Sequence, residues 1–178
     1  ITGNPVRKEI QSVNPPSVRL SGRDQQPLRL LVLGGSLGAQ ALNEILPEVL
    51  SSLPGELHVE VWHQTGLVHI DATRALYTSH QLHSARLDAY INDMAAAYAW
   101  ADLVLCRAGA STISEICNAG VAAILVPYPH AVDDHQTANA RYLSDVGAAI
   151  LLPQSELTTA SVMGLLSRFY YERNKIMD

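Results

Sequence analysis

Short apolar runs alternate with amphipathic segments along almost the whole chain, which limits the fold to few architectures. The first run, Leu28 to Leu33, is apolar apart from Arg29, as expected of a strand buried on both faces. The same pattern predicts strands at 28–33, 57–62, 84–90, 103–106, 122–126 and 148–152. It predicts helices at 39–50, 67–77, 94–100, 112–119, 136–146 and 158–171. Strict alternation of strand and helix predicts a Rossmann-like α/β fold, a parallel sheet of about six strands with helices on both faces.

The beginning of the chain differs in composition from the rest. Residues 11–27 are polar and carry four prolines or glycines, which is typical of an exposed connector. The chain begins at Ile1 rather than Met and stops at Asp178 inside an expected helix. We therefore expect a fragment of a longer protein. In it, residues 1–27 are an entry segment, and residues 28–178 are a domain truncated at its C-terminal end.

Composition excludes several classes of protein. A hydrophobic content of 48% with 16% charged residues is typical of a globular domain rather than a disordered or fibrous chain. The net charge of −5, with no basic cluster, argues against a nucleic-acid partner. Cys106 and Cys117 match no metal or redox spacing and are expected to be reduced thiols. The sequence has neither a signal peptide nor an apolar run of membrane-spanning length.

A glycine-rich turn follows the first expected strand. Gly34, Gly35 and Gly38 allow backbone N–H groups to face outward, and Ser36 can donate a hydroxyl beside the next helix start. These features suit an anion, although the turn lacks the G-x-G-x-x-G spacing of dinucleotide-binding domains. The alternative is that Ser36 is an ordinary N-cap and the glycines only tighten the corner.

A second small-residue turn follows the strand at 103–106. Gly109 and Ala110 permit close approach of a ligand, and the helix start beside them carries Ser111, Thr112 and Glu115. Alternatively, Thr112 and Glu115 form a capping box that only satisfies backbone donors. The segment itself does not decide between a ligand site and a helix cap.

The loop from Pro127 to Asn139 is also rich in polar residues. Gln136 and Asn139 carry paired donors and acceptors that suit sugar hydroxyls. A metal site is one alternative, and a solvated loop in which Asp133 or Asp134 caps the next helix is another. The potential metal ligands are His130, Asp133, Asp134 and His135.

Most of these polar residues follow expected strands, whose carboxyl ends share one edge in a parallel sheet. This common position favours a ligand site over helix capping. The residues are Ser36, His63, Gln64, Asn92, Arg107, Ser111, Thr112, His130, Asp133, Asp134, His135 and Gln136.

Several segments together resemble a known enzyme family over nearly the whole chain. The chain is similar to the C-terminal, donor-binding domain of the bacterial transferases that add N-acetylglucosamine to lipid I to form lipid II. The resemblance implies that residues 28–178 are a nucleotide-sugar-binding domain and that residues 1–27 enter it from a missing N-terminal domain. The segments are 3–7 (GNPVR), 34–40 (GGSLGAQ), 62–66 (WHQTG), 91–98 (INDMAAAY), 107–115 (RAGASTISE), 135–136 (HQ) and 139–140 (NA). Position 111 is usually a larger apolar residue in that family, and position 135 is often Gln.

The resemblance implies a role for each matching position. Arg7 and Ser36 correspond to residues at the diphosphate of UDP-N-acetylglucosamine. The backbone of Ile91 corresponds to the uracil contact, and Glu115 to the contact with the ribose hydroxyls. The implied substrate-binding set is Arg7, Ser36, Ile91, Ala110, Ser111, Thr112, Glu115, His135 and Gln136.

The resemblance also implies a reaction. The muramyl C4 hydroxyl of lipid I attacks C1 of the donor sugar, UDP leaves, and the anomeric centre is inverted, with no metal or other cofactor. The missing N-terminal domain would bind lipid I, supply the general base and contact the membrane, on the cytoplasmic side of the inner membrane. This domain alone is expected to be inactive. A UDP-N-acetylglucosamine 2-epimerase, a non-catalytic nucleotide-sugar-binding subunit and a dinucleotide-dependent oxidoreductase are the alternatives.

Overall fold

The computed structural model describes residues 4–35, 37–131 and 134–176 of the chain. At its centre lies a six-stranded sheet in the order β3-β2-β1-β4-β5-β6, with every neighbouring pair parallel. The strands are β1 (Leu28–Leu33), β2 (Val59–Gln64), β3 (Arg86–Asp88), β4 (Leu103–Cys106), β5 (Ala122–Leu125) and β6 (Ala149–Leu151). The predicted Rossmann-like fold is confirmed.

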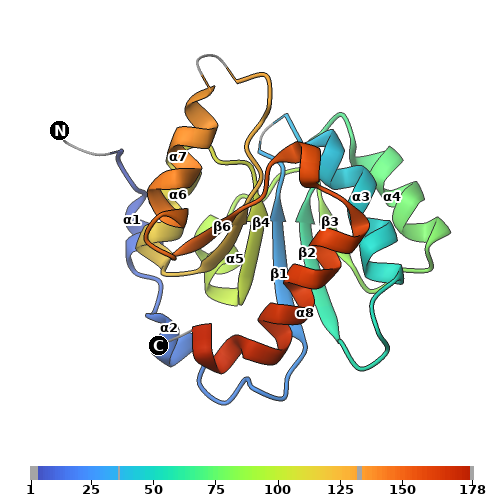
Figure 1. The fold of residues 1–178 in the computed structure, drawn as a ribbon, viewed down its shortest axis with the longest axis horizontal. Coiled ribbons are helices and arrows are strands. Elements are labelled where there is room, and N and C mark those ends of the chain that lie inside the picture. Colours follow the sequence, from blue (N-terminus) through green and yellow to red (C-terminus); the bar gives the residue numbers. More distant parts are fainter. Residues whose placement is uncertain (1–3, 36, 132–133, 177–178) are drawn as a thin grey trace.

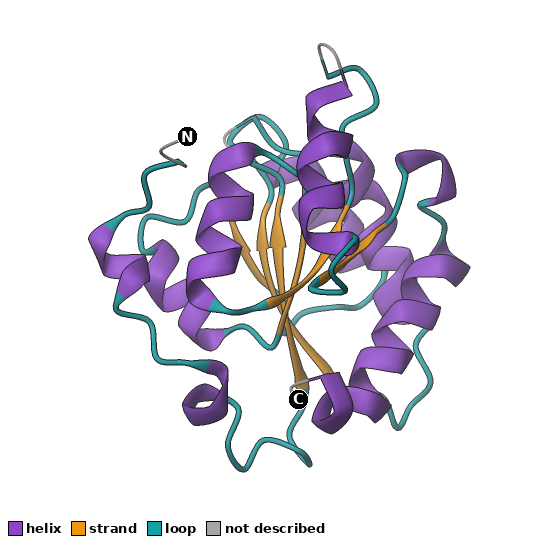
Figure 2. Cartoon of the chain, turned by 60° about the vertical axis from the view of Figure 1, so that its left-hand side comes forward, coloured by secondary structure: helices purple, strands orange, loops and turns teal. Residues whose placement is uncertain are grey.

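Helices cover both faces of the sheet (Figures 1 and 2). One face packs against α1, α5, α6 and α7, and the other packs against α3, α4 and α8. The helices are α1 (Lys8–Gln11), α2 (Pro16–Arg19), α3 (Gln40–Ser51), α4 (Ile70–Ser79), α5 (Met94–Trp100), α6 (Ala110–Ala119), α7 (His135–Ser144) and α8 (Thr159–Ile176). A short 3₁₀ turn, η2 (Gln154–Glu156), joins β6 to α8.

The near-continuous apolar character of β1 follows from this layered arrangement. Leu31 and Leu33 belong to the core under α5 and α6, whereas Leu30 and Val32 belong to the core under α3 and α8. Successive side chains of a strand point to opposite faces, so a strand covered on both sides needs an apolar residue at nearly every position.

The second strand differs from its predicted bounds. It was expected at 57–62, and β2 instead spans Val59–Gln64, in register with all six residues of β1. His63 and Gln64 therefore lie inside the sheet, and both are buried. Pairing with β1 overrides their polar character, which had marked them as loop residues.

Residues 11–27 before β1 are exposed or partly exposed, as their composition predicts, but the segment before β1 also contacts the domain. It contains the short helices α1 and α2, and Ile10 of α1 is 1% exposed within the core under α5 and α6. The guanidinium of Arg19 donates hydrogen bonds to the carbonyl oxygens of Tyr98, Ala101, Ala119 and Gly120 at 3.0–3.3 Å. The division of the chain at residue 27 stays a prediction.

Within the described ranges, no helix combines the length and hydropathy that crossing a bilayer requires.

Candidate functional site

The site lies where the strand order reverses. β1 pairs with β2 on one side and β4 on the other, and the helices after β1 and β4 cover opposite faces of the sheet. Their connections therefore separate and leave a crevice outside the carboxyl ends of the two strands, the usual ligand position in such sheets. The loops at this crevice include Gly34, Gly35 and Gly38 after β1, and Arg107 and Gly109 after β4.

Two adjoining cavities occupy the crevice. The larger cavity has a volume of about 720 Å³, and the smaller cavity has a volume of about 300 Å³. Leu33, Gly35 and Thr112 line both of them, so the end of β1 and the start of α6 form their common border.

The smaller cavity carries an acid held by two neighbours. Oε2 of Glu115 accepts a hydrogen bond from the Tyr98 hydroxyl at 3.0 Å, and Oε1 lies 3.8 Å from Nε of Arg7. The side chain of Glu115 is 13% exposed and that of Arg7 is 52% exposed. The cavity therefore presents a partly buried carboxylate beside an accessible cation.

The capping-box alternative for Thr112 and Glu115 is wrong. The helix α6 begins at Ala110, and Gly109 occupies its N-cap position, where no side chain accepts a hydrogen bond from the helix. Thr112 therefore lies inside the first turn, where it cannot act as the N-cap. Glu115 interacts with Tyr98 and Arg7 instead.

The larger cavity contains an arginine fixed from several sides. The Nη2 atom of Arg107 donates a hydrogen bond of 2.6 Å to Oε1 of Gln154, and Nη1 donates to the carbonyl oxygens of Val126 and Pro127 at 3.2 Å. Its guanidinium carbon lies 5.4 Å from the centre of the Tyr128 ring. Burial lowers the pKa of Arg107 below its ordinary value. The larger cavity thus has a rigid cationic wall.

Gln136 of α7 also lines the larger cavity. Its Oε1 accepts a hydrogen bond of 2.9 Å from the backbone N–H of Tyr128, which ties the start of α7 to the loop after β5. Nearby, Nδ2 of Asn139 donates to the carbonyl oxygen of Ala108 at 3.0 Å. The two amides predicted to suit a sugar therefore also connect α7 to the loops after β4 and β5.

The glycine loop after β1 is buttressed by the loop after β2. Gly38 has φ of +79°, and a Cβ there would overlap the carbonyl oxygen of Thr65, so the position needs glycine. Nδ2 of Asn43 donates to the same carbonyl oxygen at 3.0 Å. Ala39 is the N-cap of α3 and makes no side-chain cap, so this helix start presents backbone donors beside the larger cavity.

Most of the predicted site residues lie at this crevice. Arg7, Ile91, Ser111, Thr112 and Glu115 line the smaller cavity, and Thr112 and Gln136 line the larger one. Ala110 and His135 are exposed at the starts of α6 and α7, outside the two linings. Ser36 lies outside the described residues. The contacts that each residue makes with a ligand stay predictions.

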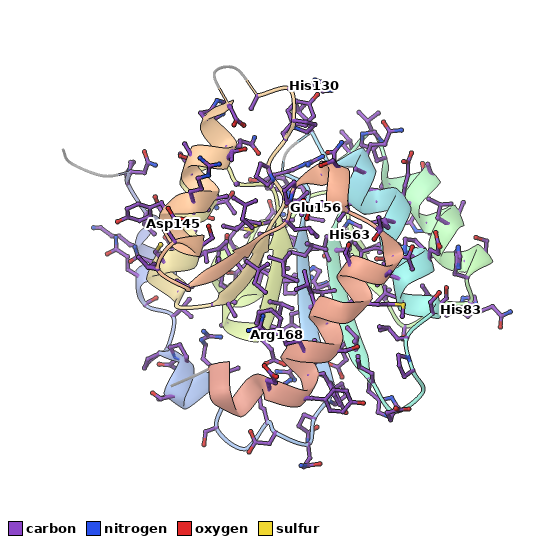
Figure 3. The ribbon with its side chains drawn as sticks, in the orientation of Figure 1. His63, His83, His130, Asp145, Glu156 and Arg168 are labelled. Carbon is purple, nitrogen blue, oxygen red and sulfur yellow. The ribbon has the colours of Figure 1, made fainter. Side chains whose placement is uncertain are left out.

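The loop after β5 was also predicted as a possible metal site or helix cap. Among the described residues no group of three potential metal ligands comes together, and Asp133 lies outside them. His130 projects from the loop, with its ring centre 5.5 Å from that of Tyr128 (Figure 3). Asp134 is the N-cap of α7, but its Oδ1 accepts from the Thr137 hydroxyl rather than from a backbone N–H.

Several residues that line the two cavities, or contact those that do, were not predicted from the sequence. Arg107 was placed at the strand edge without a role, and Tyr98, Tyr128 and Gln154 were not selected. Gln154 follows β6 at the same edge of the sheet, so the rule that selected the other residues could have found it. Tyr98 occupies an apolar-facing position of α5, and only its contact with Glu115 distinguishes it from the core.

Comparison with known proteins gives consistent matches. The sequence model of the glycosyltransferase family 28 C-terminal domain matches residues 29–177. The chain is 51% identical to the "UDP-N-acetylglucosamine--N-acetylmuramyl-(pentapeptide) pyrophosphoryl-undecaprenol N-acetylglucosamine transferase" of Cellvibrio japonicus, over 99% of this chain and 48% of that protein. It is 56% identical to the protein of the same name from Nitrosomonas europaea, over 91% and 45%.

Solved structures of glycosyltransferases also match the chain. A crystal structure of MurG from Acinetobacter baumannii matches with a TM-score of 0.83 and 42% identity, over 94% of this chain and 48% of that one. A glycotransferase of kitacinnamycin matches with a TM-score of 0.63 over 86% and 38%, and at 19% identity it shares the fold alone. The chain spans about half the length of the relatives that it matches.

Proposed function

The chain belongs to the glycosyltransferase family 28 C-terminal domain family, and from this premise we propose that it binds UDP-N-acetylglucosamine. It would be the donor-binding half of an inverting transferase that adds N-acetylglucosamine to lipid I. The names of its relatives favour a transferase over an epimerase or a dinucleotide-dependent oxidoreductase.

One observation carries the proposal. The two cavities join at Leu33, Gly35 and Thr112 and together present, in one crevice, groups that suit each part of a nucleotide sugar. Glu115 is a carboxylate that accepts hydrogen bonds from ribose hydroxyls, and Arg7 is an accessible cation within reach of the same cavity.

The diphosphate would lie between the two cavities. There the start of α3, with no side-chain cap, offers backbone N–H groups and the positive end of the helix dipole. Arg7 would add a full positive charge nearby, and Ser36 would also contact the diphosphate. Positive charge from these groups stabilises the leaving UDP, and no metal or other cofactor forms part of the proposal.

The sugar would occupy the larger cavity. Gln136 lies on its wall, and the amide suits sugar hydroxyls. Arg107, held by Gln154 and two carbonyl oxygens, adds a fixed donor surface beside it. Ala110, Ser111 and Thr112 at the start of α6 would complete the contacts between diphosphate and sugar.

In the proposed reaction, the C4 hydroxyl of the muramyl residue of lipid I attacks C1 of the donor sugar. The bond from C1 to the diphosphate oxygen breaks, UDP carries away the electron pair, and the configuration at C1 inverts. We assign binding of lipid I, the general base and the contact with the inner membrane to the other half of the protein. On its own this half should bind the donor without transferring it.

Calorimetric titration with UDP-N-acetylglucosamine tests the proposal. A few charged hydrogen bonds, less the cost of association, correspond to a dissociation constant in the millimolar-to-micromolar range, on the order of 10⁻³ to 10⁻⁶ M. The variant Glu115→Ala should lose most of this binding with an unchanged melting temperature. Glu60→Ala is the matched control, because Glu60 is an exposed acid of β2 in an ion pair with Arg29.

Two results would contradict the proposal. One is the absence of heat on titration with the nucleotide sugar at millimolar concentration, and the other is equal binding of NADH. A loss of stability in Glu115→Ala with binding retained would return Glu115 to a structural role.

A further inference from the structure

Tyr98 lies inside the core but reaches the site through its hydroxyl. The residue has no exposed surface, and its ring packs in the core formed by α5, α6 and the sheet. Its hydroxyl lies at the wall of the smaller cavity, 3.0 Å from Oε2 of Glu115. A buried phenol in an otherwise alanine-rich helix thus ends at an acid that lines this cavity.

The direction of this hydrogen bond is fixed by chemistry. An ionised carboxylate only accepts hydrogen bonds, so the phenol must be the donor. Burial raises the pKa of Tyr98 above its ordinary value, and the charge of Glu115 raises it further. The hydroxyl therefore keeps its proton at neutral pH and can donate it in a hydrogen bond to Oε2.

We propose that Tyr98 is a positioning residue that orients the carboxylate of Glu115 for the ribose hydroxyls of the nucleotide. The inference rests on the proposed function, since it assumes that a uridine nucleotide occupies the smaller cavity. Tyr98 ends one of the segments that resemble the family, 91–98, but it is not in the implied substrate-binding set. The proposal adds it to that set and assigns discrimination between ribose and deoxyribose to the Tyr98–Glu115 pair.

Orientation matters because a glutamate has several rotatable bonds. Arg7, the other partner of Glu115, lies 3.8 Å from Oε1 and is half exposed, so it restrains the carboxylate weakly. Tyr98 comes from the packed interior and has little freedom of its own. A carboxylate held before the ligand arrives loses less conformational freedom on binding, which increases affinity for the group that it contacts.

The test compares two ligands that differ only in the ribose hydroxyls, UDP and 2′,3′-dideoxy-UDP. The unmodified chain should prefer UDP. The variant Tyr98→Phe keeps the ring and removes the donor, and we expect it to bind UDP about three- to tenfold more weakly, the size of one modest hydrogen bond. Its affinity for the dideoxy nucleotide should equal that of the unmodified chain.

Two further variants complete the experiment. Tyr77→Phe is the matched control, because Tyr77 is also a buried tyrosine, but its hydroxyl contacts His63 on the other face of the sheet. It should leave the affinities for both nucleotides unchanged. Glu115→Asp keeps the charge but shortens the side chain away from Tyr98, so it should reduce the preference for ribose, as Tyr98→Phe does.

The outcomes separate this inference from the proposed function. If the unmodified chain binds UDP but Tyr98→Phe or Glu115→Asp keeps the full preference for ribose, the positioning role is overturned alone. Equal weakening of both nucleotides in Tyr98→Phe also overturns it, because that pattern indicates altered packing. If the unmodified chain binds neither nucleotide, the proposed function fails and this inference fails with it.

Discussion

Nε of Arg7 lies 3.8 Å from Oε1 of Glu115 at the wall of the smaller cavity, although Arg7 precedes α1 and Glu115 belongs to α6. The contact brings the first described residues of the chain to the end of the sheet where the strand order reverses. Because Arg7 is 52% exposed, the pair contributes little to stability and leaves the guanidinium available to a ligand.

Arg7→Ala should weaken binding of UDP by about tenfold or more, since a hydrogen bond to a charged group contributes about 1.5–3 kcal/mol. Uridine, which has no phosphate, should bind the variant and the unmodified chain equally. Calorimetry with both ligands measures this. Arg74→Ala removes an exposed arginine paired with Asp71 and serves as the control. Equal weakening for uridine would argue against a diphosphate contact.

Gly38→Ala should destabilise the fold by about 3 kcal/mol, from its left-handed backbone and from overlap with the Thr65 carbonyl oxygen. Gly35→Ala is the matched control. Gly35 has a similar φ of +80° but open space around the position of a Cβ, so the expected cost is about 1 kcal/mol. Urea denaturation compares the two. Equal losses in the free energy of unfolding would mean that the backbone around Thr65 moves away from the new Cβ without loss of stability.

The elements predicted best from the sequence are those with a local physical signal. β1 and β4 have their predicted bounds, because each is an apolar run buried on both faces. The bounds of α5 are also as predicted, since Asp93 accepts a hydrogen bond of 2.9 Å from the backbone N–H of Ala96 and fixes the helix start.

The elements predicted poorly depend on contacts between distant segments. His63 is buried with its Nδ1 3.0 Å from the hydroxyl of Tyr77 of α4, and no local pattern indicates that partner. Arg19 lies in the polar, proline-containing segment 11–27, yet its guanidinium donates hydrogen bonds to carbonyl oxygens of the domain. Composition describes a segment on its own, whereas burial depends on what covers it.

The same distinction applies to the site. The strand-end rule led to Ser111, Thr112 and Gln136 because parallel topology alone brings such residues to one edge. Tyr98 could not be found in this way, since it lies within a helix and is important only through its contact with Glu115. Residues that support a ligand contact from behind leave no pattern along the chain.

Arg19→Ala should lower the free energy of unfolding by about 2–4 kcal/mol, because it leaves carbonyl oxygens at the C-terminal ends of α5 and α6 without their donor. Arg19→Lys should recover only part of this stability, since an ammonium cannot reproduce the planar arrangement of donors of a guanidinium. Chemical denaturation measures both variants, and Arg168→Ala, at an exposed pair with Glu172, is the control. A loss no greater than that of the control would mean that α2 docks without Arg19.

The buried ring of His63 should make stability depend on pH. Burial lowers its pKa to about 3, whereas the unfolded chain takes up the proton near the ordinary value of 6.5. Below pH 6.5 the unfolded chain is therefore stabilised by taking up a proton that the folded chain does not bind. The free energy of unfolding keeps the full contribution of the neutral ring above pH 6.5 and loses it progressively as the pH drops from 6.5 toward 3. One such group adds a slope of at most about 1.4 kcal/mol per pH unit to the free energy of unfolding.

In urea denaturation between pH 7 and pH 4, His63→Asn should show a shallower dependence of the free energy of unfolding on pH than the unmodified chain. His83→Asn, at an exposed position on the surface (Figure 3), should reproduce the unmodified slope. Parallel curves for His63→Asn and the unmodified chain would show that His63 takes up its proton without unfolding.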